Sequence, residues 1–164
     1  MVNKLIKFDD EEIFIDANIF IYFFRLHSKY SESSKKFLSN LIDGKFKGFT
    51  TTLVLEEVAY ALLIRSVSDD FDQHPIEVIR ETPEVIGKYS DRLHYAINII
   101  LSMDNLAFLD TPVEQLYSMT LEMRHGLLTR NALYLAAIKE NNIKNIASYD
   151  GDFDRVDSIV RWGY

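Results

Sequence analysis

Cysteine is absent from this 164-residue chain, which excludes a disulfide framework, a thiolate zinc site and a cysteine nucleophile. Long hydrophobic runs are also missing, because no apolar stretch approaches the roughly 20 residues that a membrane-spanning helix needs. The first residues, MVNKLIKFDDEE, turn acidic too early for a secretion signal. We therefore expect a cytoplasmic protein with no membrane partner.

Several catalytic motifs are missing as well. The sequence has no GxSxG elbow, no Walker A loop and no GxGxxG turn, which removes the usual serine hydrolase, nucleoside-triphosphate and dinucleotide sites. Its four histidines form no HExxH or similar pair, which argues against zinc. The remaining composition, 48% hydrophobic and 26% charged, is that of an ordinary globular protein. The length predicts a single domain over residues 1–164.

Basic residues are fewer than acidic ones, 18 against 25. The resulting formal net charge of −7 argues against nonspecific binding along nucleic acid. The charge is unevenly distributed, however. Residues 25–47 carry six basic and two acidic side chains, whereas residues 69–91 carry seven acidic and two basic ones. Solvated helix surfaces explain both segments most simply, although the basic segment would also suit an RNA ligand.

Short apolar segments alternate with helical patterns along the chain. We expect strands over 13–16, 47–51, 106–110 and 146–150, with a fifth, at a sheet edge, over 158–162. We expect helices over 31–42, 53–66, 75–103 (in two pieces around Pro83), 112–126 and 129–142, with a long loop over 66–75. This alternation predicts an α/β protein with a mainly parallel, four- or five-stranded sheet that helices cover on both faces.

Acidic side chains follow several of these strands, where open α/β sheets bind their ligands. Asp16 ends the first strand inside the apolar run IFIDANIFIYFF, and Asn18 lies two residues later. A buried carboxylate is costly unless hydrogen bonds or a positive charge offset it. Asp150 ends the fourth strand and Asp152 follows it. Asp110 ends the third strand, but we interpret it as a cap of the next helix.

The helices supply further oxygen atoms. Glu56 and Glu57 lie early in one helix, and the apolar neighbours of Glu57 favour it slightly as the site acid; either can instead complement the helix dipole. Asn131 opens another helix beside Thr129, the expected cap, and it can equally be a satisfied core amide. Crowded oxygen ligands of this kind are typical of a Mg²⁺ or Mn²⁺ site.

Three stretches, taken in order, resemble the successive motifs of PIN-domain ribonucleases, and most closely the VapC toxins of toxin–antitoxin pairs and their archaeal relatives. These stretches are IFIDANIFIYFF, TTLVLEEVAYAL and LLTRNALYLAAIKENNIKNIASYDGDFDRV, and the resemblance covers residues 13–160. It implies a Rossmann-like three-layer α/β/α sandwich and Mg²⁺- or Mn²⁺-dependent hydrolysis of RNA phosphodiester bonds.

The resemblance also implies roles for individual residues. By position, the implied catalytic and metal-binding acids are Asp16, Glu57 and Asp150, and the implied further ligand and flanking polar residues are Asp152, Asn18 and Ser148. An ion held by these acids lowers the pKa of a bound water, and the resulting hydroxide attacks phosphorus in line. Arg25 and Arg130 can hold the RNA phosphate, although each can also be a structural arginine.

One position departs from the family. Where the family pattern reads (S/R)DALHLA, this chain reads RNALYLA, so Asn131 stands in place of an aspartate. An amide oxygen can coordinate a metal ion, but the side chain lacks charge and is a poor general base. We therefore expect one well-bound ion, a weaker second one and reduced activity.

The resemblance implies an RNA substrate, a cognate antitoxin and a homodimer, for which residues 75–103 are the favoured interface. The alternative function is a catalytically impaired PIN-like module that binds RNA or protein. An aspartyl-nucleophile phosphatase is a weaker alternative, because Asn18 occupies the place of its second aspartate. A purely structural α/β domain would leave Asp16 unexplained.

Overall fold

The computed structural model describes residues 3–25 and 29–163. These residues form a parallel sheet of six strands in the order β1-β6-β5-β2-β3-β4. The strands are β1 (Asn3–Lys4), β2 (Glu12–Ile15), β3 (Lys47–Thr51), β4 (Leu106–Leu109), β5 (Asn145–Ala147) and β6 (Val160–Gly163). The predicted three-layer α/β/α class is confirmed. The expected count of four or five strands was too low, because β1 adds a two-residue edge strand that is too short for a periodic pattern.

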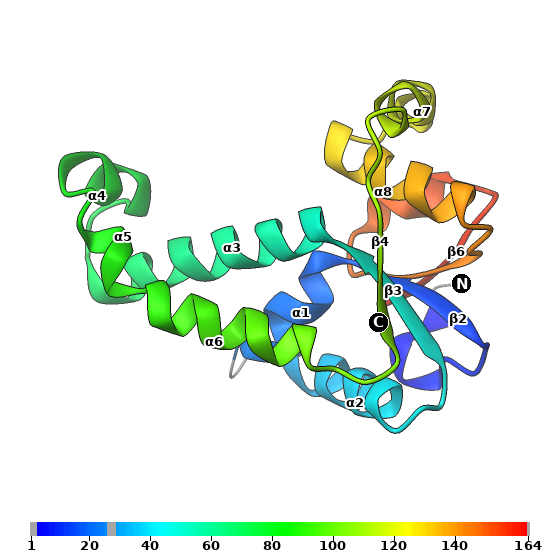
Figure 1. Ribbon diagram of the computed structural model, residues 1–164, viewed down its shortest axis with the longest axis horizontal. Coiled ribbons are helices and arrows are strands. Elements are labelled where there is room, and N and C mark those ends of the chain that lie inside the picture. The colour runs from blue at the N-terminus through cyan, green and yellow to red at the C-terminus, as the bar shows by residue number, and fades with distance from the viewer. Residues whose placement is uncertain (1–2, 26–28, 164) are drawn as a thin grey trace.

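The helices surround this sheet and run on into an extension (Figure 1). They are α1 (Ala17–Phe24), α2 (Ser31–Ile42), α3 (Thr52–Asp70), α4 (Pro75–Glu81), α5 (Val85–Lys88), α6 (Ser90–Leu101), α7 (Gln115–Glu122) and α8 (Thr129–Glu140), with short 3-10 helices η1 (Leu5–Lys7), η2 (Met123–His125) and η3 (Gly151–Arg155). Within the described part of the chain, no helix is both long and apolar enough to cross a membrane.

Four local predictions were wrong. The segment 75–103 forms three helices rather than two, and α3 continues to Asp70, so the expected loop over 66–75 shrinks to four residues. The helix α3 continues because Ser66 and Val67 are buried, so extending the helix packs their side chains against the rest of the protein. Thr129 is the first residue of α8 rather than its cap. Asp110 lies well before the first residue of α7 and does not cap it.

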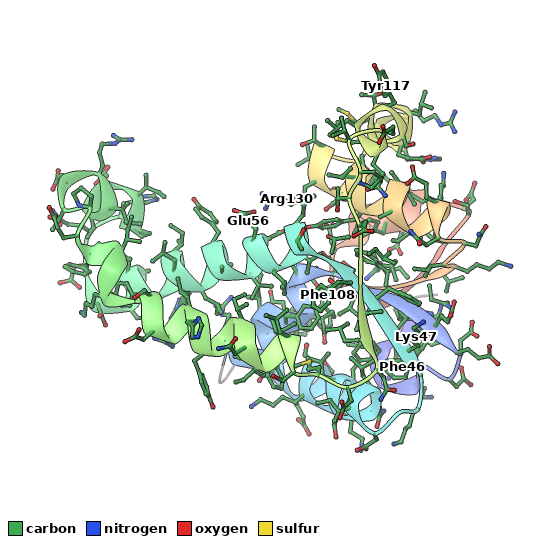
Figure 2. The ribbon with its side chains drawn as sticks, in the orientation of Figure 1. Phe46, Lys47, Glu56, Phe108, Tyr117 and Arg130 are labelled. Atoms are coloured by element: carbon green, nitrogen blue, oxygen red, sulfur yellow. The ribbon has the colours of Figure 1, made fainter. Side chains whose placement is uncertain are left out.

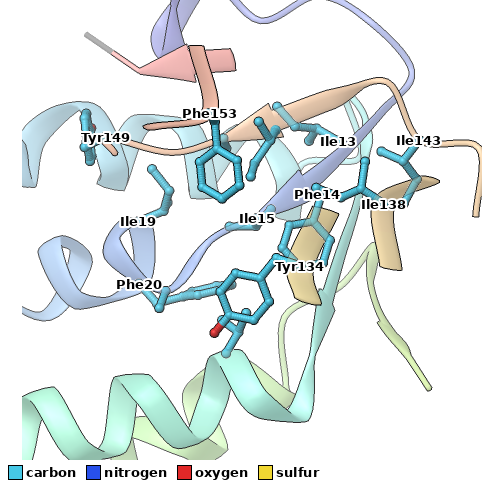
Figure 3. Close-up of a cluster of buried hydrophobic side chains, with 14 of the residues drawn as sticks. Ile13, Phe14, Ile15, Ile19, Phe20, Tyr134, Ile138, Ile143, Tyr149 and Phe153 are labelled. Carbon is cyan, nitrogen blue, oxygen red and sulfur yellow. The ribbon is translucent and has the colours of Figure 1, made fainter. Parts of the chain in front are cut away.

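The strand β2 lies at the centre of the main core. Ile13, Phe14 and Ile15 are fully buried, as expected for a parallel strand covered on both faces. Phe14 packs against Tyr134 of α8, with ring centroids 5.7 Å apart, whereas Ile15 lies on the opposite face near Leu41 of α2 (Figure 3). The two helical layers therefore meet the two sides of this one strand.

A second, smaller core stabilises the extension. The helices α3 and α6 run side by side away from the sheet, and α4 and α5 lie at their far end (Figure 1). There Val67, Val78, Val85 and Tyr89 form a separate buried cluster. The acidic residues 69–91 belong to this end of the molecule. The acidic segment is thus held away from the sheet.

The order of the strands in the sheet reverses direction at β2. From β2 the chain proceeds to β3 and β4 on one side, and it then returns to β5 and β6 on the other side. Ligands of open α/β sheets bind beyond the carboxyl ends of the strands at such a reversal. Asp16 is the residue that follows β2.

Gly48 in β3 provides a test of the core packing. A Cβ at this position would lie 2.8 Å from Ile15 Cδ1 and 2.9 Å from Leu41 Cδ1. We expect Gly48→Ala to lower the free energy of unfolding by about 1–3 kcal/mol, because these side chains must shift within a full core. Urea denaturation measures the change. Gly87→Ala is the matched control, because nothing lies within 4 Å of its Cβ position; equal losses for both variants would contradict this account.

Candidate active site

The carboxylate of Asp16 is held at the junction of β2 and α1. Asp16 is the N-cap of α1, and its Oδ1 accepts a hydrogen bond of 2.7 Å from the backbone N–H of Ala17. Its Oδ2 accepts hydrogen bonds from Ser148 Oγ, at 2.6 Å, and from Asn18 Nδ2. The residue is only 5% exposed. Asp16 thus combines a structural cap with a buried carboxyl group at the end of the central strand.

Asn18 and Ser148 join the first turn of α1 to the loop after β5. Asn18 Nδ2 donates to Ser148 Oγ at 3.0 Å, and Asn18 Oδ1 accepts from the backbone N–H of Tyr149 at 3.1 Å. Ser148 Oγ in turn accepts from the backbone N–H of Asp150 at 3.0 Å. These polar neighbours therefore fix Asp16 and Asp150 relative to one another.

Asp150 and Asp152 have different partners. Asp150 caps η3, where its Oδ1 accepts from the backbone N–H of Asp152 at 2.9 Å, and its Oδ2 accepts from Asn131 Nδ2 at 2.8 Å. The carboxylate of Asp152 forms an ion pair of 2.8 Å with Arg155. Asn131 therefore contacts the site as a hydrogen-bond donor, and Asp152 is already partly neutralised.

The structure distinguishes the two glutamates of α3. Glu57 is half-buried, and its Oε2 accepts a 2.8 Å hydrogen bond from the hydroxyl of Tyr134. Glu56 is exposed and contacts Arg130 at 3.3 Å (Figure 2). Arg130 also lies 3.4 Å from Glu57. Of the two, only Glu57 accepts a hydrogen bond from a buried side chain among the described residues.

Sequence reasoning missed Tyr134. The available signal was a tyrosine inside the apolar stretch ALYLAA, three residues after Asn131, because a buried tyrosine hydroxyl usually finds a hydrogen-bond partner. Arg25 is the other predicted RNA-binding residue, and its described contact is with an aromatic ring rather than with one of these acids. It ends α1, and its guanidinium lies 5.7 Å from the centroid of the Tyr22 ring. Residues 26–28 of the basic segment lie outside the described residues.

The acids influence one another electrostatically. The pKa of Asp16 is raised from 3.8 to about 7, mainly by burial, with smaller contributions from the negative charges of Glu57 and Asp150. Hydrogen bonds from Ser148 and Ala17 act in the opposite direction. The carboxylates from β2, α3 and the loop after β5 are therefore close enough to feel each other's charge.

The donor chemistry of this group suits a hard cation, because its atoms are carboxylate, amide and hydroxyl oxygens. In residues 3–25 and 29–163, however, no three His, Asp or Glu side chains come together closely enough to hold one ion. The acids are neighbours without forming a complete ligand cage. The assignment of metal ligands stays a prediction.

The structure is a parallel α/β/α sandwich with a group of acidic side chains beyond its central strands. A comparison with models of known protein families identifies the family to which this class of structure belongs here. The PIN domain model matches residues 13–159, so the chain belongs to the PIN domain family. The predicted family resemblance is confirmed. That residues 1–164 form one such domain stays a prediction.

Individual relatives agree with this family. Ribonuclease VapC6 of Methanocaldococcus jannaschii is 26% identical over 151 residues, which cover 90% of this chain and 94% of the relative. Ribonuclease VapC2 of the same organism is 25% identical over 156 residues, with coverages of 95% and 96%.

Two solved structures share the fold. One is VapBC2 of Rickettsia felis, bound to a fragment of its promoter DNA, with a TM-score of 0.59, 16% identity and coverages of 93% and 98%. The other is VapC20 of Mycobacterium tuberculosis, a toxin that cleaves the sarcin-ricin loop, with a TM-score of 0.59, 15% identity and coverages of 90% and 96%. At these identities the similarity establishes the fold.

The raised pKa of Asp16 predicts an unusual dependence of stability on pH. Between pH 4 and 7 the folded, metal-free protein keeps a proton on Asp16 that the unfolded chain releases. The free energy of unfolding should therefore decrease as pH rises through this window, by as much as about 4 kcal/mol, and level off above it. Urea denaturation in chelator, at a series of pH values, measures this slope.

Asp16→Asn provides the control for this pH series. The amide does not ionise, so the variant should lack the decrease between pH 4 and 7, whatever its absolute stability. Parallel profiles for the wild type and Asp16→Asn would contradict the assignment.

Proposed function

We propose that this chain is a metal-dependent endoribonuclease of the VapC type, which hydrolyses RNA phosphodiester bonds with activity reduced by Asn131. One observation carries the proposal. The buried carboxylate of Asp16 lies within electrostatic reach of Glu57 and Asp150, and its described hydrogen-bond donors are all neutral. A divalent cation would stabilise this group of charges. The names of the archaeal relatives, both ribonucleases, support the same function.

In this proposal Asp16 and Asp150 hold the ion, and Glu57 reaches it through water. Bound Mg²⁺ or Mn²⁺ supplies a Lewis acid that activates water and stabilises the negative charge on the phosphate. Asn18 and Ser148 keep the Asp16 carboxylate in place through their hydrogen bonds. Because the ion must displace a proton at Asp16 with its pKa of about 7, metal binding should strengthen as pH rises toward neutrality.

Two side chains on the rim can interact with RNA. Arg130 is about half exposed and pairs with Glu56 and Glu57, so it can turn to a phosphate by exchanging one surface ion pair for another. Arg155 pairs with Asp152 and donates to the carbonyl of Gly126 at 2.8 Å. Asp152 is therefore a weaker ligand candidate than Asp150.

The alternative is a catalytically impaired PIN-like module that binds RNA or protein. Asn131 favours this alternative, because it donates a hydrogen bond to Asp150 where the family pattern has an acid. The phosphatase alternative has no support from the family to which the chain belongs.

A cognate antitoxin belongs to the proposed biology, because one solved structure with this fold is described as a VapBC complex. We also propose a homodimer, but through α7 rather than through residues 75–103. The region around α7 exposes six large apolar side chains, from 40% to 79%: Val113, Leu116, Tyr117, Leu121, Met123 and Leu128. Tyr117 projects outward from α7 (Figure 2). Several large apolar side chains exposed within one short segment are typical of an interaction surface. A cytoplasmic location stays a prediction.

The central test is cleavage of a single-stranded RNA in the presence of Mn²⁺. We expect the wild type to cleave the RNA. The cleavage rate of Asp150→Asn should be lower by about 100-fold or more, because the substitution weakens the proposed site for the ion. Asp110→Asn is the control, since Asp110 also follows a strand but is exposed and lies outside the acidic group. Cleavage by wild type and Asp150→Asn at equal rates would contradict the proposal.

Asn131→Asp separates the two candidate functions in the same assay. If Asn131 only reduces activity, the wild type cleaves slowly and the variant faster. If the wild type binds no Mn²⁺ and does not cleave, while the variant does both, the wild type is the impaired binding module.

The dimer proposal predicts that Tyr117→Arg is a monomer by multi-angle light scattering, because a charge would be buried in the apolar interface. Tyr95→Arg is the matched comparison, since Tyr95 is 68% exposed and lies in the segment favoured from the sequence. A dimer for Tyr117→Arg and a monomer for Tyr95→Arg would restore the interface over 75–103.

A further inference from the structure

We propose that Tyr134 is a positioning residue, whose hydroxyl holds the Glu57 carboxylate in the place from which it would reach the proposed divalent ion through water. The inference rests on the proposed metal-dependent function. It concerns a side chain that packs in the core rather than one that faces the substrate.

The contacts of Glu57 both fall on one oxygen. Glu57 Oε2 accepts the 2.8 Å hydrogen bond from Tyr134 and lies 3.4 Å from Arg130 Nη1. The first distance is that of a strong hydrogen bond, and the second is that of a loose ion pair. The hydroxyl of Tyr134 is therefore the closer and better directed partner of Glu57.

Tyr134 can impose an orientation because it cannot easily move. The residue is 1% exposed, and its ring packs on Phe14 of β2. Figure 3 shows the ring within the apolar cluster, with its hydroxyl at the edge toward α3. A well-packed aromatic ring holds its hydroxyl more firmly than a flexible surface side chain could.

The hydroxyl is also a permanent donor. Burial and the negative charge of Glu57 raise the pKa of Tyr134 far above its ordinary value of 10. The phenol therefore stays protonated at neutral pH. A protonated phenol donates to a carboxylate without neutralising it, so Glu57 keeps the charge that a cation needs.

Without this hydroxyl, Arg130 would be the remaining described partner of Glu57. Arg130 is about half exposed and also contacts Glu56, which is itself 60% exposed. A carboxylate released from Tyr134 would be drawn toward this surface pair and its charge would be partly neutralised. Both effects weaken binding of the ion.

The same helix acts in the same way on a second acid. Asn131 donates to Asp150 at 2.8 Å, one helical turn before Tyr134. Residues three apart lie on the same side of a helix. The helix α8 thus presents two neutral donors, each to one acid of the site.

Tyr134→Phe tests this role, because it removes the hydroxyl and keeps the ring. Mn²⁺ affinity is measured by calorimetry at neutral pH, without RNA. We expect binding to weaken by about 10–100-fold, the usual effect of losing a group that orients a metal ligand. Unchanged affinity would overturn the proposal.

Tyr89→Phe is the matched control. Tyr89 is also buried and donates a 2.7 Å hydrogen bond to a carboxylate, Asp70, but it lies at the far end of the extension. The Tyr89→Phe variant should have a lower melting temperature than the wild type and the same Mn²⁺ affinity. If both variants weaken Mn²⁺ binding equally, the effect of Tyr134 is general destabilisation and the proposal is wrong.

A double-mutant cycle shows whether Tyr134 acts through Glu57. In a Glu57→Ala background, Tyr134→Phe should change Mn²⁺ affinity less than two-fold, because the group that it orients is gone. A full additional loss in that background would overturn the proposal.

The two proposals fail in different ways. If the wild type binds Mn²⁺ and cleaves RNA while Tyr134→Phe does so equally well, only the role of Tyr134 fails. If the wild type binds no Mn²⁺, the metal-dependent function fails and this inference with it.

Discussion

A carboxylate buried at the end of the central strand is the constraint around which the site is organised. Burial removes Asp16 from water, and hydrogen bonds from the backbone N–H of Ala17 and from the side chains of Asn18 and Ser148 compensate for this loss. Losing any of these donors would leave a buried charge unsatisfied. The hydrogen bonds also tie the loop after β5 to the helix after β2. Holding the charge and shaping the site are thus done by the same contacts.

Positive and neutral partners are arranged unequally around the acids. The inner acids, Asp16 and Asp150, receive hydrogen bonds from neutral donors, whereas Asp152 and the exposed Glu56 pair with arginines. Neutral donors orient a carboxylate and leave its charge in place. The negative charge is therefore concentrated in the centre of the site, where a cation would be held, and is offset toward the rim.

The extension formed by α3 and α6 separates two groups of acidic residues in space. Its first turns carry Glu57 to the sheet, and its far end has a small core of its own, with the acidic residues 69–91 around it. Had this acidic segment lain beside Asp16, it would have added further negative charge to the acids there. The length of α3 keeps it apart (Figure 1).

The sequence by itself determined the class of fold, the positions of the main strands along the chain and the place of Asp16 at the end of one of them, because apolar periodicity and residues at strand ends are local properties. It also indicated Glu57 over Glu56, through the apolar neighbours of Glu57 along one helix. Only the tertiary structure decided which groups these acids meet. Tyr134 and Glu57 are 77 residues apart in sequence, and Asn18 and Ser148 are 130 apart. No local pattern encodes such contacts, because they arise when packing brings α8 and the loop after β5 against β2 and α3.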